Sequence, residues 1–144
     1  MSSPTYIVGS LLFFFAAACA TSRPPLKSVV RQLRSPHPQA RVRAMGQLSL
    51  YGPEAQKALP YLVENFRDRR ETVNRAAEKA MVSLKEPGAQ AFGSLLSDKD
   101  SWVRCRSAAA LGQMPADAGA VVPALVEALH DKDFCVQEKA AMAL

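Results

Sequence analysis

The sequence predicts an all-α fold, an α-solenoid of about four helical hairpins stacked side by side. Apolar residues of the segment 55–66 recur in the segment 118–129 at the same offsets, spaced as on one face of an α-helix. Each such helix is followed by a polar turn and a second amphipathic helix. The first core residues of the second helices lie 33, 30 and 33 residues apart, at Ala40, Val73, Val103 and Val136. A steady period of this length is typical of stacked helical repeats, whose hairpins bury their apolar faces against their neighbours.

Length and composition fit one globular unit rather than a large multidomain enzyme. The chain has 144 residues, of which 49% are hydrophobic and 22% charged. These values are ordinary for a packed protein and exclude both wholesale disorder and a polytopic membrane protein. The three cysteines predict no disulfide framework, and the two histidines lack the paired cysteines of a zinc site. We therefore expect no metal and no cofactor.

The first element is an uncharged apolar segment, Tyr6–Ala20. A helix of this length spans only about 22 Å, short of the roughly 30 Å hydrocarbon core of a bilayer, so the segment is typical of an export signal. We expect residues 1–18 to form this N-terminal signal helix. The small residues directly before Cys19 resemble a bacterial lipobox. That resemblance implies cleavage before Cys19, lipid attachment to its sulfur, and a short proline-containing tether over residues 19–25.

Three locations stay open for the folded domain. A lipid on Cys19 would hold it in the bacterial cell envelope as an exported, membrane-anchored lipoprotein. Cleavage after Ala18 or Ala20 would release a secreted or periplasmic protein, since small residues also precede these positions. An uncleaved segment would anchor the chain in the inner membrane and leave the domain facing the cytoplasm, because all nearby positive charges follow the apolar run.

Positive charge is concentrated at the N-terminal end of the chain. Residues 1–43 carry six basic side chains and no acidic one, whereas residues 44–144 carry 12 basic and 13 acidic side chains. A basic end beside an apolar segment indicates attraction to an anionic membrane surface, and an ordinary solvated flank is the alternative. The near-neutral remainder lacks aromatic residues interleaved for base stacking, so we expect no nucleic-acid partner.

The repeat domain is expected to span residues 26–144. The period divides it into units of approximately 26–52, 53–86, 87–115 and 116–144, each a pair of helices. Pro60 and Pro123 occupy equivalent positions in the first helices of two units. We expect each to lie inside its helix, remove a backbone donor and bend the axis. The last repeat is expected to be incomplete, because its second helix reaches Leu144 without a capping residue.

Three motifs recur in the second half of the chain. They are Leu-Leu-Ser-Asp-Lys-Asp-Ser-Trp-Val-Arg at 95–104, Ala-Ala-Ala-Leu-Gly at 108–112 and Ala-Leu-His-Asp-Lys-Asp-Phe-Cys-Val-Gln at 128–137. The motifs resemble the HEAT repeat, and more closely its phycobilisome-lyase-type subfamily. The resemblance covers about residues 26–144 and implies a right-handed superhelical stack. Some such proteins assist bilin attachment, and related hydroxylases bind iron through His-Glu pairs, but neither His37 nor His130 precedes a glutamate.

An aspartate recurs five residues before the first core residue of three second helices, at Asp68, Asp98 and Asp131. This position favours capping, in which a carboxylate accepts hydrogen bonds from free backbone N–H groups. A calcium loop is excluded because its glycine and distal glutamate are missing. The HEAT resemblance implies that Arg41 and Arg104 pair with an aspartate of the same or a neighbouring unit, in a ladder that fixes the stacking angle.

Exposed positions of the predicted second helices carry five basic residues: Arg43, Arg75, Lys79, Arg106 and Lys139. A solenoid presents these helices on an extended concave face, so the five could form a basic track for an acidic protein segment, a lipid headgroup or a polyanion. A solvated charged face is the alternative. Trp102, Cys105 and Cys135 are interpreted as packing or surface residues. The two histidines form no catalytic pair.

Together these patterns favour a noncatalytic scaffold for protein–protein interaction, exported and lipid-anchored, with no catalytic residue and no small-molecule substrate. Its partner would be an unidentified protein, acidic if it uses the basic track. The alternatives are an accessory subunit of a phycobilin-lyase-like or other HEAT-type enzyme, and a membrane-anchored adaptor that faces the cytoplasm.

Overall fold

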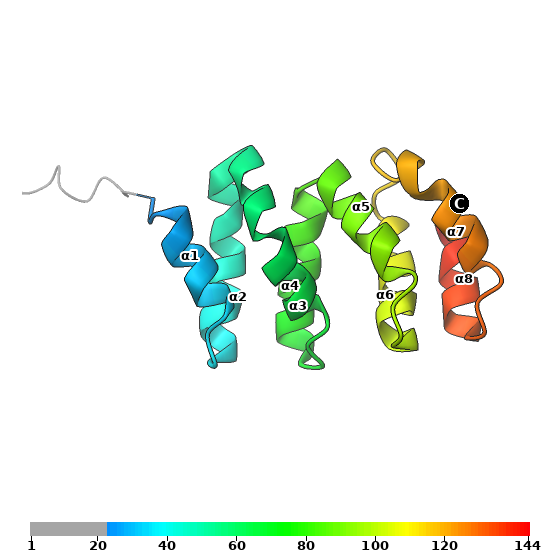
Figure 1. The fold of residues 1–144 in the computed structure, drawn as a ribbon, viewed down its shortest axis with the longest axis horizontal. Helices are drawn as coiled ribbons and strands as arrows, with labels where there is room; N and C mark the ends of the chain where they lie inside the picture. Colours follow the sequence, from blue (N-terminus) through cyan, green and yellow to red (C-terminus); the bar gives the residue numbers. More distant parts are fainter. Residues whose placement is uncertain (1–22) are drawn as a thin grey trace, which may run out of the picture.

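The structure is a computed structural model that describes residues 23–144. Over these residues it contains eight α-helices, two 3-10 helices and no strand, which confirms the all-α prediction (Figure 1). The helices are α1 (Leu26–Leu33), α2 (Pro38–Gln47), η1 (Leu48–Ala58), α3 (Leu59–Phe66), α4 (Glu71–Ser83), α5 (Glu86–Leu95), α6 (Ser101–Leu111), η2 (Gly119–Val121), α7 (Val122–Ala128) and α8 (Phe134–Ala143). The predicted signal segment, residues 1–18, and Cys19 lie outside the described residues.

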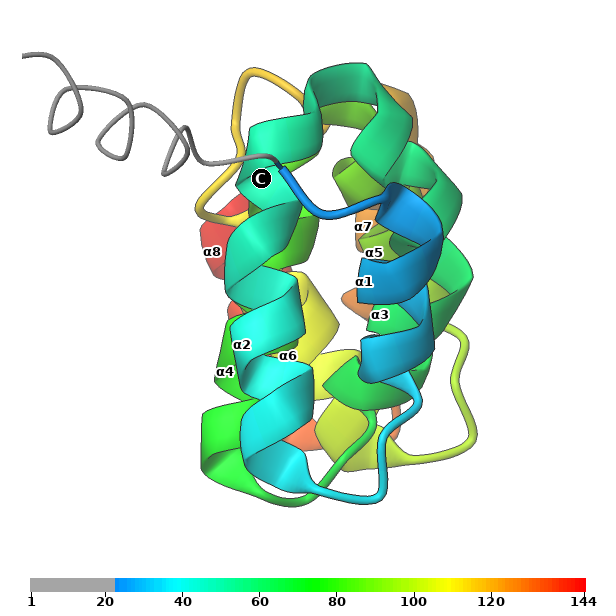
Figure 2. The same ribbon diagram turned by 90° about the vertical axis from the view of Figure 1, so that its left-hand side faces the viewer.

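Four hairpins follow one another along the long axis of the molecule (Figure 1). Viewed along that axis, the helices form two layers (Figure 2). The first helices of the hairpins, α1, α3, α5 and α7, make one layer, and the second helices, α2, α4, α6 and α8, make the other. This arrangement confirms the α-solenoid. The handedness of the superhelix stays a prediction.

The helices are short, and the longest, α4, has 13 residues. Isolated helices of this length are marginal in water, so most of their stability comes from packing of their apolar faces. None of the described helices is both long and apolar enough to cross a membrane. The fold therefore depends on contacts between hairpins.

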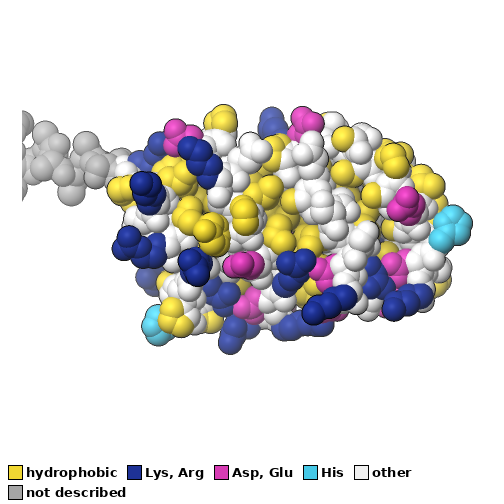
Figure 3. Space-filling model, in the orientation of Figure 1, with side chains coloured by type: hydrophobic (Ala, Val, Ile, Leu, Met, Phe, Trp, Pro, Cys, Tyr) yellow, Lys and Arg dark blue, Asp and Glu magenta, His cyan; other side chains and the backbone are white. Residues whose placement is uncertain are grey.

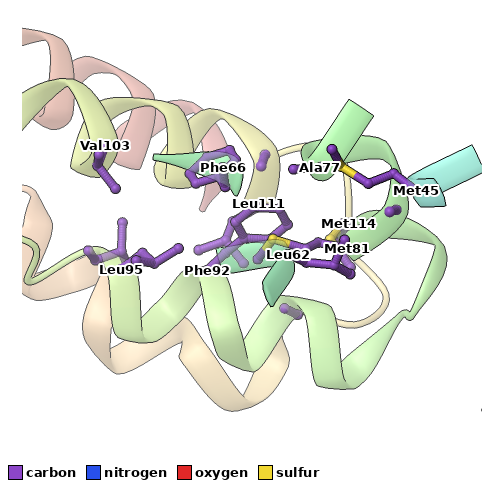
Figure 4. Packing of buried hydrophobic residues seen from close by; sticks show 14 of the residues in the cluster. Met45, Leu62, Phe66, Ala77, Met81, Phe92, Leu95, Val103, Leu111 and Met114 are labelled. Atoms are coloured by element: carbon purple, nitrogen blue, oxygen red, sulfur yellow. The ribbon is translucent and has the colours of Figure 1, made fainter. Parts of the chain in front are cut away.

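The apolar core runs between the two layers (Figure 4). Its largest fully buried side chains include Phe66 of α3 and Phe92 of α5, whose ring centroids lie 5.3 Å apart in an edge-to-face arrangement. This geometry is the one that the ring quadrupoles favour. Ser107 of α6 is also buried, and its hydroxyl donates a 2.8 Å hydrogen bond to the carbonyl of Val103, which satisfies it there.

Two residues of the predicted apolar stripe are not buried. Val122 and Val126 of α7 are 41% and 46% exposed, although the equivalent residues of α3, Leu59 and Val63, pack against the core. Within residues 23–144, a following hairpin covers that side of α3 but none covers that side of α7 (Figure 1). Val122 and Val126 therefore mark a face of α7 that is equivalent to the Leu59 and Val63 face of α3 but is not covered by another hairpin within the described residues.

The expectation that Pro60 and Pro123 lie inside continuous helices is wrong. Pro60 lies in the first turn of α3 and Pro123 in the first turn of α7, and a 3-10 helix precedes each α-helix. In the first turn a proline lacks only an N–H that would have no partner within the helix, so it begins the α-helix rather than kinking it. The apolar residues of the 3-10 helix and of the following α-helix face the same core. The periodicity of the sequence is therefore unbroken where the helix type changes.

Cys105 packs against the core, as interpreted from the sequence, but the sequence predicted no bond between it and Cys135. Cys105 of α6 and Cys135 of α8 form a disulfide, with Cα atoms 5.6 Å apart. This separation is the usual one for a disulfide. The bond ties the third hairpin to the fourth, within the layer of second helices.

Candidate functional site

Each turn between the two helices of hairpins two, three and four is shaped by its recurrent aspartate. The Oδ1 atom accepts a hydrogen bond from the backbone N–H two residues later: Asp68 from Arg70 at 2.9 Å, Asp98 from Asp100 at 3.0 Å and Asp131 from Asp133 at 2.9 Å. This is the geometry of an Asx turn. The recurrent aspartate therefore folds the turn, one step before the helix cap itself.

The cap is supplied by the second aspartate of the turn in two hairpins. Asp100 accepts a 3.0 Å hydrogen bond from the N–H of Trp102, and Asp133 accepts a 2.9 Å hydrogen bond from the N–H of Cys135. Both bonds satisfy an N–H group of a first helical turn. The N-cap of α4 is Arg70, which makes no side-chain capping hydrogen bond.

Arg104 and Arg41 each reach from one hairpin to the aspartate of the next. Arg104 binds Asp131 through two parallel hydrogen bonds, of 2.7 Å from Nε and 2.8 Å from Nη2. A third hydrogen bond of 2.9 Å joins Arg104 Nη1 to the backbone carbonyl of Asp98. Arg41 binds Asp68 at 2.7 Å and the Oδ1 of Asn65 at 2.9 Å. Such charge-assisted bonds fix both distance and orientation.

The series of arginines is interrupted between hairpins two and three. At the equivalent position α4 carries Asn74, whose side chain is too short to reach the next hairpin and instead donates to the carbonyl of Asp68 at 3.1 Å. Asp98 is bound by Arg67 from the preceding turn, with distances of 2.9 and 2.6 Å. The Arg67 side chain is 48% exposed, whereas that of Arg104 is 7% exposed. This junction is therefore more accessible to water than its counterpart between hairpins three and four.

These contacts hold the turn aspartates in their charged form. Burial alone would raise the pKa of Asp68 and of Asp98, but hydrogen bonds from backbone N–H groups and arginines outweigh it, and both pKa values lie below the ordinary 3.8. For Asp131 the hydrogen bonds from Arg104 are the largest influence, and they lower its pKa against the effect of burial.

A groove of about 560 Å³ lies between α2 and α4 in the layer of second helices. We call it the α2–α4 groove, and it is lined by Val42, Met45, Gly46, Ser49, Thr72, Arg75, Ala76, Lys79, Ala80 and Ser83. Met45 and Ala80 are buried, and Val42 and Ala76 are half-buried, so the floor is apolar. Arg75 and Lys79 are exposed at its rim. An apolar floor with a few polar groups at the edge is the usual composition of a binding site.

The structure divides the five residues of the predicted track. Arg75 and Lys79 line the groove, and Arg43 is exposed on α2 one residue after Val42. Arg106 is half-buried, forms an ion pair with Glu78 of α4 and stacks on Trp102 at 5.4 Å. Lys139 lies on α8, near Glu138 at 3.6 Å. The groove thus brings together two of the five, and Arg106 is engaged in joining α4 to α6.

Trp102 belongs to this same junction between the second and third hairpins. The guanidinium of Arg69 lies 4.7 Å from the centre of the Trp102 ring, and the guanidinium of Arg106 lies 5.4 Å from it. Arg69 also pairs with Asp100 at 2.5 Å. Cation–π contacts and ion pairs therefore connect α4 and its turn to α6.

The described residues contain no cluster of histidine, cysteine and acidic side chains that could hold a metal ion. His37 and His130 are exposed and lie in different hairpins. The sequence interpretation missed two features, the disulfide and the groove. The groove is formed by small residues on two facing helices. Gly46, Ala76 and Ala80 were the sequence signal for it, because small side chains let α2 and α4 approach closely but do not fill the space between them.

The family model for HEAT repeats matches residues 89–144, which comprise most of α5 and all helices up to α8. The match does not address the phycobilisome-lyase-type subfamily, which stays a prediction. None of the curated proteins matches this sequence. Among solved structures, the crystal structure of an engineered protein from the Northeast Structural Genomics Consortium is 21% identical, with a TM-score of 0.48. The alignment covers 82% of this chain and 60% of the engineered one.

Proposed function

We propose that this chain is a noncatalytic scaffold, exported and lipid-anchored through Cys19, that binds an acidic amphipathic segment of a partner protein in the α2–α4 groove. The observation that carries the proposal is an apolar groove rimmed by two exposed basic side chains, on a fold made of stacked hairpins. HEAT repeats present extended surfaces of this kind, which serve protein–protein contacts.

The chemistry of the groove indicates the character of the partner. Lys79 has no ion pair within residues 23–144, and Arg75 pairs only with Glu71 at 3.1 Å, where both side chains are mostly exposed. An exposed pair of this type is weak and readily exchanged for another carboxylate. Val42, Met45 and Ala76 offer apolar surface beside these charges. A helix or extended segment with apolar residues beside acidic ones matches both features.

The disulfide supports export. Disulfides between structural cysteines persist in oxidising compartments and are rare where thiols are kept reduced. Cys105 and Cys135 are joined in this structure, which fits a cell-envelope or secreted location better than the cytoplasm-facing alternative. Lipid attachment to Cys19 rests on the sequence pattern alone.

Affinity capture from the cell-envelope fraction tests the groove. Full-length protein carrying Arg75→Glu and Lys79→Glu should lose the acidic partner, because the reversed charges repel it. The matched control carries Lys57→Glu and Lys132→Glu, two exposed lysines outside the groove, and should retain the partner. Capture should weaken steeply with added salt. A partner retained equally by all three proteins would overturn the proposed site.

Mass spectrometry of the mature N-terminus tests the anchor independently. A diacylglycerol adduct on Cys19 at the new N-terminus is the expected result. An unmodified thiol on an intact N-terminus would exclude the lipoprotein, and cleavage without lipid would identify the secreted form. A bilin-lyase accessory role would instead require pigment transfer to a partner subunit, and no residue of the described groove favours it.

A further inference from the structure

The N-terminal helix carries a second charged surface, on the opposite layer from the groove. Lys27 and Arg31 of α1 and Arg34, its C-cap residue, are spaced four and three residues apart, which places them on one side of the helix, and all three are exposed. The other face buries Val29 and Leu33 in the core. We call these three side chains the α1 basic stripe.

The stripe has no acidic partner within residues 23–144, unlike Arg23 and Arg41. Arg41 is bound to Asp68 at 2.7 Å. Arg23 donates a 2.7 Å hydrogen bond to the carbonyl of Leu50, lies 3.9 Å from Glu54 and stacks on Tyr51 at 4.3 Å. These two arginines are used within the fold, whereas the charges of the stripe are available to an external anion.

A shallow groove of about 710 Å³ opens beside the stripe, between α1 and α3. All three basic residues line it, together with Val30, Gln32, Ser35, Pro36 and Tyr61. The guanidinium of Arg34 lies 5.9 Å from the centre of the Tyr61 ring. Guanidinium and ammonium groups bind phosphate through charge-assisted hydrogen bonds, and tyrosine is favoured at membrane–water interfaces. The surface therefore has the chemistry of a phospholipid headgroup site.

We propose that the α1 basic stripe and its groove dock the solenoid on an anionic phospholipid membrane. The chain holds no acidic residue before Glu54. Lys and Arg side chains lie at the α1 end of the face seen in Figure 3, and others follow its lower edge, where acidic side chains lie among them. The other three helices of this layer expose a glutamate each: Glu64 on α3, Glu86 on α5 and Glu127 on α7. Within this layer an anionic surface therefore attracts the α1 end more strongly than the helices that follow it, which favours docking through that end.

Position along the chain favours a membrane over a free anion or a nucleic acid. Seven peptide units separate Cys19 from Leu26, a span of at most about 25 Å. A lipid on Cys19 would thus keep the stripe within reach of headgroups. The docking goes beyond the proposed function. Its choice of a membrane rests on the lipid anchor proposed there, whereas the positive charge belongs to the stripe itself. Helices α2 and α4 lie in the other layer (Figure 2), so docking through α1 would leave the groove between them open.

Sedimentation with lipid vesicles tests the docking. Full-length protein is mixed with vesicles of phosphatidylcholine alone or of phosphatidylcholine and phosphatidylglycerol. The wild type should prefer the anionic vesicles, and Lys27→Glu, Arg31→Glu and Arg34→Glu together should weaken that binding more than about 100-fold, because loss of the three positive charges alone is worth roughly fivefold each. A milder variant with glutamine at the three positions should lose an intermediate amount, and it keeps the test informative if the reversed variant folds poorly.

The control carries Lys57→Glu, Lys85→Glu and Lys132→Glu, three exposed lysines elsewhere with the same total change of charge. It should bind anionic vesicles within about threefold of the wild type. Equal loss in both triple variants would show that net charge alone attracts the protein, and no loss in the stripe variant would remove the site. Either result overturns the docking.

A Cys19→Ser background separates this proposal from the lipid anchor. The preference for anionic vesicles should survive in it, whereas tight binding to both vesicle types through an acyl chain should not. If the stripe variant keeps anionic-vesicle binding but loses capture of an acidic protein, the surface is a protein site and the membrane proposal is wrong. Loss of vesicle preference with an intact partner in the α2–α4 groove would confirm that the two surfaces act independently.

Discussion

Arg104 joins two segments of chain that meet only in the folded stack. Its guanidinium holds both carboxylate oxygens of Asp131 in the fourth hairpin and the backbone carbonyl of Asp98 in its own turn. The two charged side chains are only 7% and 12% exposed. Removing one member of a buried ion pair leaves the other charge without a partner in a poorly hydrated site, which is far more costly than losing an exposed pair.

Substitution of Arg104 should therefore destabilise the protein strongly. Arg104→Ala is expected to lower the free energy of unfolding by about 3 kcal/mol. The matched control is Arg75→Ala, whose partner Glu71 lies on the same helix and is 74% exposed, and which should cost about 0.5 kcal/mol. Urea unfolding followed by circular dichroism measures both. Equal effects would show that Arg104 contributes no more than a surface charge.

The same ion pair predicts acid sensitivity. Because the hydrogen bonds from Arg104 lower the pKa of Asp131 below 3.8 in the folded state, the unfolded chain binds a proton at higher pH than the folded chain does. The stabilisation is therefore complete above the unfolded pKa and is lost as pH falls through the lowered folded pKa.

Asp131→Asn, which cannot ionise, isolates this effect. The difference in unfolding free energy between the wild type and Asp131→Asn should be constant at neutral pH and should shrink as pH falls below about 4. Urea midpoints measured across this range test it. A difference that does not change with pH would mean that the Asp131 charge adds nothing to stability.

At the scale of elements, the links between successive hairpins use one backbone conformation twice. Gly52 has φ 51° and Lys85 has φ 58°, at positions one period of 33 residues apart. Their ψ values are −132° and −126°. Glycine adopts this region without steric penalty, whereas the Cβ of lysine is strained there. In the second link, Lys85 thus adopts a backbone conformation that is unfavourable for a residue with a Cβ atom.

Lys85→Gly should consequently stabilise the protein. Relief of strain is worth about 1 to 3 kcal/mol, and the added flexibility of the unfolded chain offsets about 0.5 to 1 kcal/mol of that. We expect a net gain of roughly 1 kcal/mol. The reciprocal variant Gly52→Ala should lower stability. Thermal unfolding measures both, and a loss of stability in Lys85→Gly would contradict the strain.

The sequence predicted the hairpins well because their periodicity survives changes in local geometry. The stripe of residues 55–66 is continuous whether Ala58 belongs to an α-helix or, as found, to a 3-10 helix. Apolar spacing alone cannot distinguish the two over a few residues. The positions of Pro60 and Pro123 carried that information, since proline is tolerated best in the first turn of a helix.

Contacts between hairpins were harder to predict. Residues at the same position of the repeat point in the same direction on every hairpin. Two residues that touch across the interface between two hairpins therefore occupy different positions of the repeat. Cys105 lies two residues after Val103 and Cys135 lies one residue before Val136, and this difference is what lets α6 and α8 bring them together. The α2–α4 groove likewise depends on two unlike faces. The predicted basic track combined three different positions of the repeat, and only its two residues on α4, Arg75 and Lys79, line the groove.

For the whole molecule, the two layers divide two proposed roles. The first-helix layer carries the α1 basic stripe at one end, and the second-helix layer carries the α2–α4 groove. Two connections between hairpins three and four lie at the opposite end: the buried ion pair of Arg104 with Asp131 and the disulfide of Cys105 with Cys135. A disulfide and a buried ion pair thus reinforce the same junction.

Reduction of the disulfide should loosen this end of the solenoid. Cys105 and Cys135 are separated by 30 residues in the chain, and the restriction that such a loop places on the unfolded chain corresponds to about 3.5 kcal/mol. A dithiol reductant should lower the urea midpoint of the wild type, and Cys105→Ser should lower it equally without reductant. Adding reductant to Cys105→Ser should have no further effect, because no bond remains to break. Protein isolated from cells under alkylating conditions should show these two thiols blocked from modification. Free thiols there would contradict the oxidising compartment. An unchanged urea midpoint on reduction would contradict the stabilising role of the bond.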